Sequence, residues 1–234
     1  MIDRLDMFRG IKPSGLRWYH WLLAAALVLH LLMMGSLFWG YLDAAFAFTD
    51  ENPRAYDFFA IYEAGHRALE GDSIYGQLSS AVSLAPYFAA YRYVPAFAYG
   101  FGVPMNAIPH WPAYWAWVAF YEVLLVANVC VTWRVAGKGT WGTVGAAMWF
   151  VFTPFYVEQY AGQFSFLMAT ALLFVGIGVA RGSQETAGPP WLISLLVKTN
   201  SALLAPVFFR LRWWRTLAGG GTPSAQRSVL PMAP

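Results

Sequence analysis

The sequence has few charged residues and only one cysteine. Asp, Glu, Lys and Arg make up 12% of the 234 residues, against about 25% in an ordinary globular domain. Cys130 alone cannot form an intrachain disulfide, and it excludes a metal site built from several cysteines. The formal net charge of +3 is small and scattered, which argues against a nucleic-acid partner. The shortage of charge is the first sign that this is not a water-soluble domain.

Apolar and aromatic residues are correspondingly abundant. Hydrophobic residues make up 59% of the chain and aromatic residues 18%, whereas about 45–50% apolar residues is usual. Trp and Tyr are enriched where membrane proteins meet the lipid headgroups. The apolar content and the lack of repeats exclude a disordered, collagen-like or coiled-coil protein. The sequence therefore predicts an all-α integral protein of the cell (inner) membrane, with the lipid bilayer as its partner.

Six segments are expected to cross the bilayer, because a crossing helix needs about 20 mostly apolar residues. Residues 93–133 are long enough for two spans, and the two prolines at Pro109 and Pro112 mark the break between them. The expected spans are residues 18–42, 93–109, 112–133, 139–157, 159–180 and 190–209. The other segments are a basic tail at 1–17, a loop at 43–92 and a basic, disordered end at 210–234.

Basic residues flank both ends of the chain, so the positive-inside rule predicts that both termini are cytoplasmic. The acidic loop 43–92 is then external. Arg134, Lys138 and Arg181 would also be external, which conflicts with that rule. A re-entrant segment at 94–108 or around Lys198 would remove the conflict, so this alternative stays open.

The external loop carries a helical pattern over residues 53–70. Asn52 is a suitable N-cap, Pro53 a suitable first residue and Gly71 a suitable stop. One face of this helix would carry Phe58, Ile61, Tyr62, Gly65 and Leu69, and the other Glu63, His66, Arg67 and Glu70. The pattern predicts an amphipathic helix that lies in the membrane interface.

Asp57 lies at the edge of the apolar face of this helix, in line with Ile61 and Ala64. Two interpretations follow. The carboxylate either faces a packed body or a cavity at the membrane surface, or it is a first-turn residue that favours the helix dipole. Arg92, just before the second expected span, is suited to an anionic group such as a phosphate, or to lipid headgroups.

The order of these residues resembles the first half of glycosyltransferase family 87. The resemblance is carried by Asp57-Phe-Phe-x-x-Tyr62-x-Ala64-Gly65-x-x-x-Leu69-x-Gly71-x-x-x-Tyr75, followed by Tyr93-x-Pro95-x-Phe97. Ala161-Gly162-Gln163 before an apolar helix, and Leu195-Leu-Val-Lys198 before Pro206 and the basic stretch 210–215, resemble the same family. Its members are GT-C-type mannosyltransferases that use a polyprenyl-phosphate-mannose donor. The resemblance covers about residues 20–216.

The resemblance implies a GT-C-like helical bundle with its site at the external membrane face. The aspartate of the first external loop, Asp57 here, would be the catalytic base. We expect Arg92 and Lys198 to bind the donor phosphate, with Tyr62 and Gln163 as further substrate-binding residues. The donor is a polyprenyl-phosphate sugar, and no other cofactor is expected. No metal is expected either, because His20, His30, His66 and His110 are scattered.

Two functions are consistent with these features. The first is an inverting membrane glycosyltransferase that transfers a mannosyl or other glycosyl group to an acceptor hydroxyl. Members of the family continue with further spans, so this chain is expected to be a truncated copy. The second is a non-catalytic subunit of a larger membrane complex. A transporter or channel is disfavoured because few intramembrane polar residues form a pathway.

Lys198 could instead pair with Glu122, which is otherwise expected to be a structural partner, and Gln163 could simply bond neighbouring helices.

Overall fold

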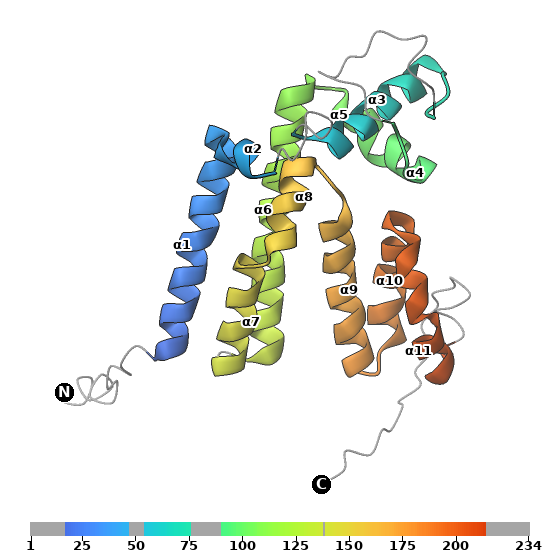
Figure 1. Cartoon of the computed structure of the whole chain (residues 1–234). Helices are drawn as coiled ribbons and strands as arrows, with labels where there is room; N and C mark the ends of the chain where they lie inside the picture. The colour runs from blue at the N-terminus through green and yellow to red at the C-terminus, as the bar shows by residue number, and fades with distance from the viewer. Residues whose placement is uncertain (1–16, 47–53, 76–89, 138, 214–234) are drawn as a thin grey trace, which may run out of the picture.

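The computed structural model describes residues 17–46, 54–75, 90–137 and 139–213, and all its regular secondary structure is helical. This confirms the all-α prediction for the described part of the chain. In Figure 1 the longer helices stand roughly upright, and the short helices of the loop region gather at one end. The expected cap at Asn52 and Pro53, residues 1–16 of the expected basic tail and residues 214–234 of the expected disordered end lie outside the described residues.

The helices follow in chain order as α1 (Trp18–Trp39), α2 (Tyr41–Phe46), α3 (Tyr56–Glu70), α4 (Pro95–Phe97), the π-helical η2 (Ala98–Gly102), α5 (Val103–Met105), α6 (His110–Ala136), α7 (Thr140–Phe150), α8 (Thr153–Ala161), α9 (Ser165–Ala180), α10 (Gln184–Val197), the 3-10 helix η3 (Thr199–Leu204) and α11 (Ala205–Arg210). The main packing pairs are α1 with α7, α6 with α7, and α9 with α10.

Among the described helices, α1 and α6 are long and apolar enough to cross a membrane by length and composition. Much of the apolar surface of α1 is not covered by the rest of the protein. Leu29, Leu31 and Leu32, in the middle of this helix, are 44%, 61% and 63% exposed. A contiguous exposed apolar surface of this kind is typical of a face that meets another apolar surface.

The second expected span, 93–109, is shorter than a crossing helix. Helices α4, η2 and α5 follow one another without a break from Pro95 to Met105. At about 1.5 Å per residue this segment is roughly 16 Å long, about half of the roughly 30 Å hydrocarbon core. It packs against α3.

The fourth and fifth expected spans have different boundaries in the structure. Residues 139–157 are divided between α7 and α8, and Pro154 stands in the first turn of α8, where its missing N–H costs no hydrogen bond. Helix α8 continues to Ala161, so α9 begins at Ser165 instead of residue 159. Gly162 ends α8 with φ of 72°, a left-handed conformation that favours glycine.

The last expected span, 190–209, is not one helix. Helix α10 starts earlier, at Gln184, because the Ser183 side chain accepts a hydrogen bond from the Thr186 backbone N–H at 3.2 Å. The helix ends at Val197, and Lys198 has extended backbone angles of φ −148° and ψ 130°. The expected mid-span lysine therefore lies at a break between two helices.

The expected polar face of helix α3 is more buried than the sequence predicts. It starts at Tyr56 and packs against η2, α5, α6 and α8. Glu63 and Arg67, expected on a solvent-facing side, are only 4% and 7% exposed, and they pair with each other at 3.5 Å. Leu69, expected on the apolar face, is 59% exposed. The expectation of a solvated polar face is wrong for Glu63 and Arg67, because η2, α5, α6 and α8 pack against α3.

Candidate functional site

The start of α3 is held against the end of α8. The Ala55 backbone N–H donates a hydrogen bond to the Tyr160 carbonyl at 2.7 Å. A Cβ atom on Gly162 would lie 2.4 Å from the Cβ of Phe58, so only glycine allows the turn after α8 to approach so closely. These two contacts place Asp57, in the first turn of α3, beside the segment that joins α8 to α9.

Two polar side chains on neighbouring segments meet the Asp57 carboxyl group. The side chains of Gln163 and Tyr93 both interact with it by hydrogen bonds. The backbone of Gln163 is held in place, because its backbone carbonyl accepts a hydrogen bond from the Tyr121 hydroxyl at 2.6 Å. The Tyr93 ring packs against Phe164 with 5.7 Å between ring centres. Both hydrogen-bonding partners of Asp57 are therefore held by contacts of their own.

Two cations act on the same carboxyl group. Lys198 and Arg92 both interact electrostatically with Asp57. Lys198 is half-buried, and its Nζ donates a hydrogen bond to Ser165 Oγ at the first residue of α9. Arg92 is exposed. The break between α10 and η3 thus brings a cation from the end of the described chain to a carboxylate near its beginning.

Burial raises the pKa of Asp57 above its ordinary value of 3.8. The hydrogen bond from Gln163, the charges of Lys198 and Arg92, and the hydrogen bond from Tyr93 act in the opposite direction. A half-buried carboxyl group with a raised pKa is suited to accept a proton. The surrounding hydrogen-bond donors and the two cations stabilise the ionised form of Asp57.

Glu158 is a second carboxyl group at this place. It interacts with the Ser165 side chain and with the Phe166 backbone N–H, both at the start of α9. Lys198 and Asp57 act on it electrostatically, and burial raises the pKa of Glu158. Its Oε2 atom is buried and has no hydrogen-bond partner in the described part of the chain.

Sequence reasoning missed Glu158, Tyr93 and Ser165 as site residues. Glu158 falls between the expected spans 139–157 and 159–180, so the rule that a charge inside a span marks a functional site does not select it. Tyr93 does stand in the family-like motif, and that position was the signal that could have identified it. Ser165 has no such signal, because its part depends on where α9 begins.

The structure brings four of the five predicted site residues together, namely Asp57, Arg92, Gln163 and Lys198. Tyr62 lies elsewhere. Its hydroxyl donates a hydrogen bond to the Ile108 carbonyl at 2.9 Å, and its own carbonyl accepts one from Asn106 at 2.8 Å. These contacts hold α3 against the segment after α5.

Glu122 also lies apart from the site. It pairs with His30 at 3.0 Å, so the alternative pairing of Glu122 with Lys198 is not formed. Among the described residues no group of three or more His, Cys, Asp and Glu side chains could hold a metal ion.

The chain matches no protein-family model, no curated protein and no solved structure. A function for this chain must therefore be argued from the residues of the site.

Proposed function

We propose that the chain is a membrane glycosyltransferase. It transfers a mannosyl or other glycosyl group from a polyprenyl-phosphate sugar to an acceptor hydroxyl. One observation carries this proposal: Asp57, which the motif suggests as the base, shares one site with Gln163, Arg92 and Lys198. These residues come from segments far apart in the sequence, and a base beside cations is what this reaction requires.

The proposed reaction is a single inverting displacement at the anomeric carbon of the sugar. Asp57 takes the proton from the acceptor hydroxyl as the acceptor oxygen forms its bond to that carbon. The bond from the carbon to the phosphate oxygen breaks, and its electron pair stays on the phosphate. The hydrogen bonds from Gln163 and Tyr93 hold the carboxylate in one orientation during this step.

The positive groups beside Asp57 suit the departing phosphate. Lys198 and Arg92 supply two cations, and the N-terminal end of α9, at Ser165, adds the positive end of a helix dipole. Burial raises the pKa of Glu158, so this carboxyl group keeps its proton to a higher pH than an exposed glutamate does. Such positive groups are most effective when they are fixed before the charge develops.

The proposal places the chain in a lipid bilayer. The exposed leucines of α1 and the two helices long enough to cross support a membrane environment. A donor that carries a polyprenyl tail is dissolved in the same bilayer, so the enzyme needs no nucleotide-sugar site. The loop region with Asp57 would lie at the external face, and the basic chain ends in the cytoplasm.

Donor binding tests this proposal before any acceptor is identified. The probe is purified polyprenyl-phosphate-mannose added to the detergent-solubilised chain, with the shift in thermal melting as the readout. The parent chain is expected to be stabilised by the donor. Lys198→Met should bind the donor roughly ten-fold or more weakly, because a hydrogen bond to a charged group contributes about 1.5–3 kcal/mol.

Arg181→Met is the matched control, because Arg181 is an exposed cation at the other end of α9. This variant should bind the donor like the parent. Failure of the parent to bind the donor would contradict the proposed function. Equal binding by the parent and Lys198→Met would remove Lys198 from the phosphate site.

A further inference from the structure

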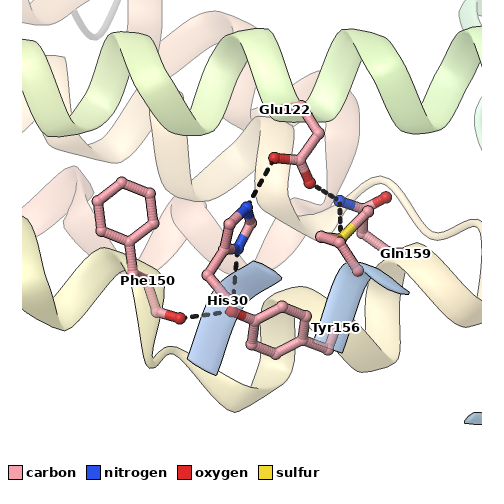
Figure 2. Close-up of polar contacts among 6 residues, drawn as sticks. His30, Glu122, Phe150, Tyr156 and Gln159 are labelled. Atoms are coloured by element: carbon pink, nitrogen blue, oxygen red, sulfur yellow. Dashed lines mark hydrogen bonds and ion pairs between the residues drawn. The ribbon is translucent and has the colours of Figure 1, made fainter. Parts of the chain in front are cut away.

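A partly buried polar network links α1, α6 and α8 (Figure 2). His30 of α1 is only 5% exposed. Its Nδ1 lies 3.0 Å from the Tyr156 hydroxyl, and its Nε2 lies 3.0 Å from Glu122 Oε2. Gln159 Nε2 lies 2.6 Å from Glu122 Oε1. Each hydrogen bond needs one donor and one acceptor, so these contacts determine which atoms carry the hydrogens.

The Tyr156 hydroxyl fixes the first proton of the network. This hydroxyl donates to the Phe150 carbonyl at 2.5 Å, and a carbonyl can only accept. The single hydroxyl hydrogen is therefore used there, so the Tyr156 oxygen must act as acceptor toward His30. It follows that His30 Nδ1 carries a hydrogen.

The Gln159 amide fixes the orientation at the other end. Its Nε2 contacts both Glu122 Oε1 and, at 3.7 Å, the Met34 sulfur. Both partners accept, which agrees with an NH₂ group at that position. Glu122 Oε1 thus receives a hydrogen bond, and the remaining contact is the one between Glu122 Oε2 and His30 Nε2. A hydrogen must lie between these two atoms, because two acceptors at 3.0 Å would repel each other.

We infer that His30 and Glu122 hold one shared proton and form an electrically neutral pair that positions α8. The pair is either an imidazolium with a carboxylate or an Nδ1–H imidazole with a carboxylic acid. The alternative, a neutral imidazole with its hydrogen on Nε2 and a carboxylate, carries a net negative charge. It would also leave Nδ1 without a hydrogen for the Tyr156 oxygen. The His30 side chain is 7% exposed and the Glu122 side chain 28% exposed, so a net charge on the pair would lose much of its hydration, which is costly.

The neutral pair acts on α8 through two residues of that helix. Tyr156 and Gln159 are three positions apart, so they lie on one face of α8. Both are bound by the pair, and Glu158, next to Gln159, contacts the start of α9. His30 and Glu122 are therefore positioning residues for the end of α8. The proton count does not depend on the proposed function, and neither measurement below requires activity.

Solid-state NMR of the chain in bilayers, with ¹⁵N-labelled histidine and ¹³C-labelled glutamate, tests the proton count. His30 Nδ1 should be protonated at neutral pH. In addition, either His30 Nε2 is protonated with Glu122 as carboxylate, or Glu122 is a carboxylic acid. An unprotonated Nδ1 beside a Glu122 carboxylate would overturn the inference. His66 and Glu70, a more exposed pair at 3.0 Å, provide a reference in the same spectra.

Variants test the positioning of α8. Glu122→Gln keeps every hydrogen bond of the network, because its amide can donate to His30 Nε2 while its carbonyl accepts from Gln159. The ¹³C carboxyl signal of Glu158 should then be unchanged. In Glu122→Leu both bonds are lost, and the Glu158 signal should move.

Thr170→Val is the control for general destabilisation, because it removes a buried 2.8 Å hydrogen bond from Asn128 on the α6–α9 side. It should lower the melting temperature and leave the Glu158 signal in place. The inference fails if Glu122→Gln moves the Glu158 signal, or if Thr170→Val moves it as far as Glu122→Leu does. The parent and Glu122→Gln remain decisive even if Glu122→Leu does not fold.

Discussion

Gly65 of α3 and Gly102 of η2 pack backbone against backbone. A Cβ atom on Gly65 would lie 2.1 Å from the carbonyl carbon of Gly102, and one on Gly102 would lie 2.4 Å from the Ile61 carbonyl oxygen. Neither position has space for a methyl group, and no flexible side chain could move aside. This contact holds the segment after Tyr93 against the helix that carries Asp57, and so brings two parts of the site together.

Gly65→Ala should therefore separate α3 from η2. We expect a loss of about 1–3 kcal/mol in the free energy of unfolding, the usual cost of overpacking. Gly100→Ala is the matched control, because Gly100 lies in the same π-helical segment and a Cβ there meets nothing within 4 Å. Melting temperatures of both variants check this, and equal melting temperatures would contradict the close contact.

Tyr62→Phe separates a structural role from a substrate-binding role for Tyr62. The change removes the hydrogen bond to the Ile108 carbonyl, so stability should fall by about 0.5–1.5 kcal/mol. Affinity for polyprenyl-phosphate-mannose should stay the same. A large loss of donor affinity at unchanged stability would restore Tyr62 to the site.

The family-like motifs of the sequence name residues that lie close together in the structure. Asp57, Gln163 and Lys198 are named by family-like motifs, and they converge even though more than a hundred residues separate the first from the second. Local patterns were less informative about helix boundaries. Periodicity does not show that α10 stops at Val197 and leaves Lys198 extended, nor that α8 continues to Ala161.

The burial of α3 could not be predicted from its own sequence. Its helical period assigns Glu63 and Arg67 to a polar face, and in isolation that face would be solvated. The structure covers both residues, and they pair with each other instead. Whether a polar face is covered depends on segments elsewhere in the chain, such as η2 and α6, so tertiary contacts decide it.

The raised pKa of Asp57 makes stability depend on pH in a definite direction. Between 3.8 and the higher folded-state pKa, the unfolded chain loses the Asp57 proton while the folded chain retains it. The contribution of Asp57 to stability therefore falls as pH rises through this window. Relative to the parent, Asp57→Asn should become more stable as pH rises, and the difference should level off above the folded-state pKa.

Thermal melts of the parent and Asp57→Asn across the acidic range check this dependence. The exposed Asp72, on the same loop, gives the matched control Asp72→Asn, which removes a carboxylate outside the Asp57 site. A relative stability of Asp57→Asn that falls with rising pH would mean that the Asp57 pKa is lowered in the folded chain.

Membrane sidedness is tested by thiol labelling in whole cells. Cys130 is exposed, so it is first replaced by alanine. Ser73→Cys, in the loop that we propose is external, should then react with an impermeant reagent in intact cells. Ser224→Cys, which lies outside the described residues, should react only after lysis. The reverse pattern would place the Asp57 site on the cytoplasmic side.

The most direct test of the central claim is the rate of sugar transfer by Asp57→Asn. The assay uses membranes that contain polyprenyl-phosphate-mannose and the native acceptors. The variant keeps the size of the side chain and removes its basicity, so transfer should fall by roughly 10²–10⁴-fold while donor affinity stays within a few-fold of the parent. Asp72→Asn should transfer at the parental rate. Equal transfer by Asp57→Asn and the parent would show that Asp57 is not the base, and a non-catalytic helical bundle would then be the better account of the chain.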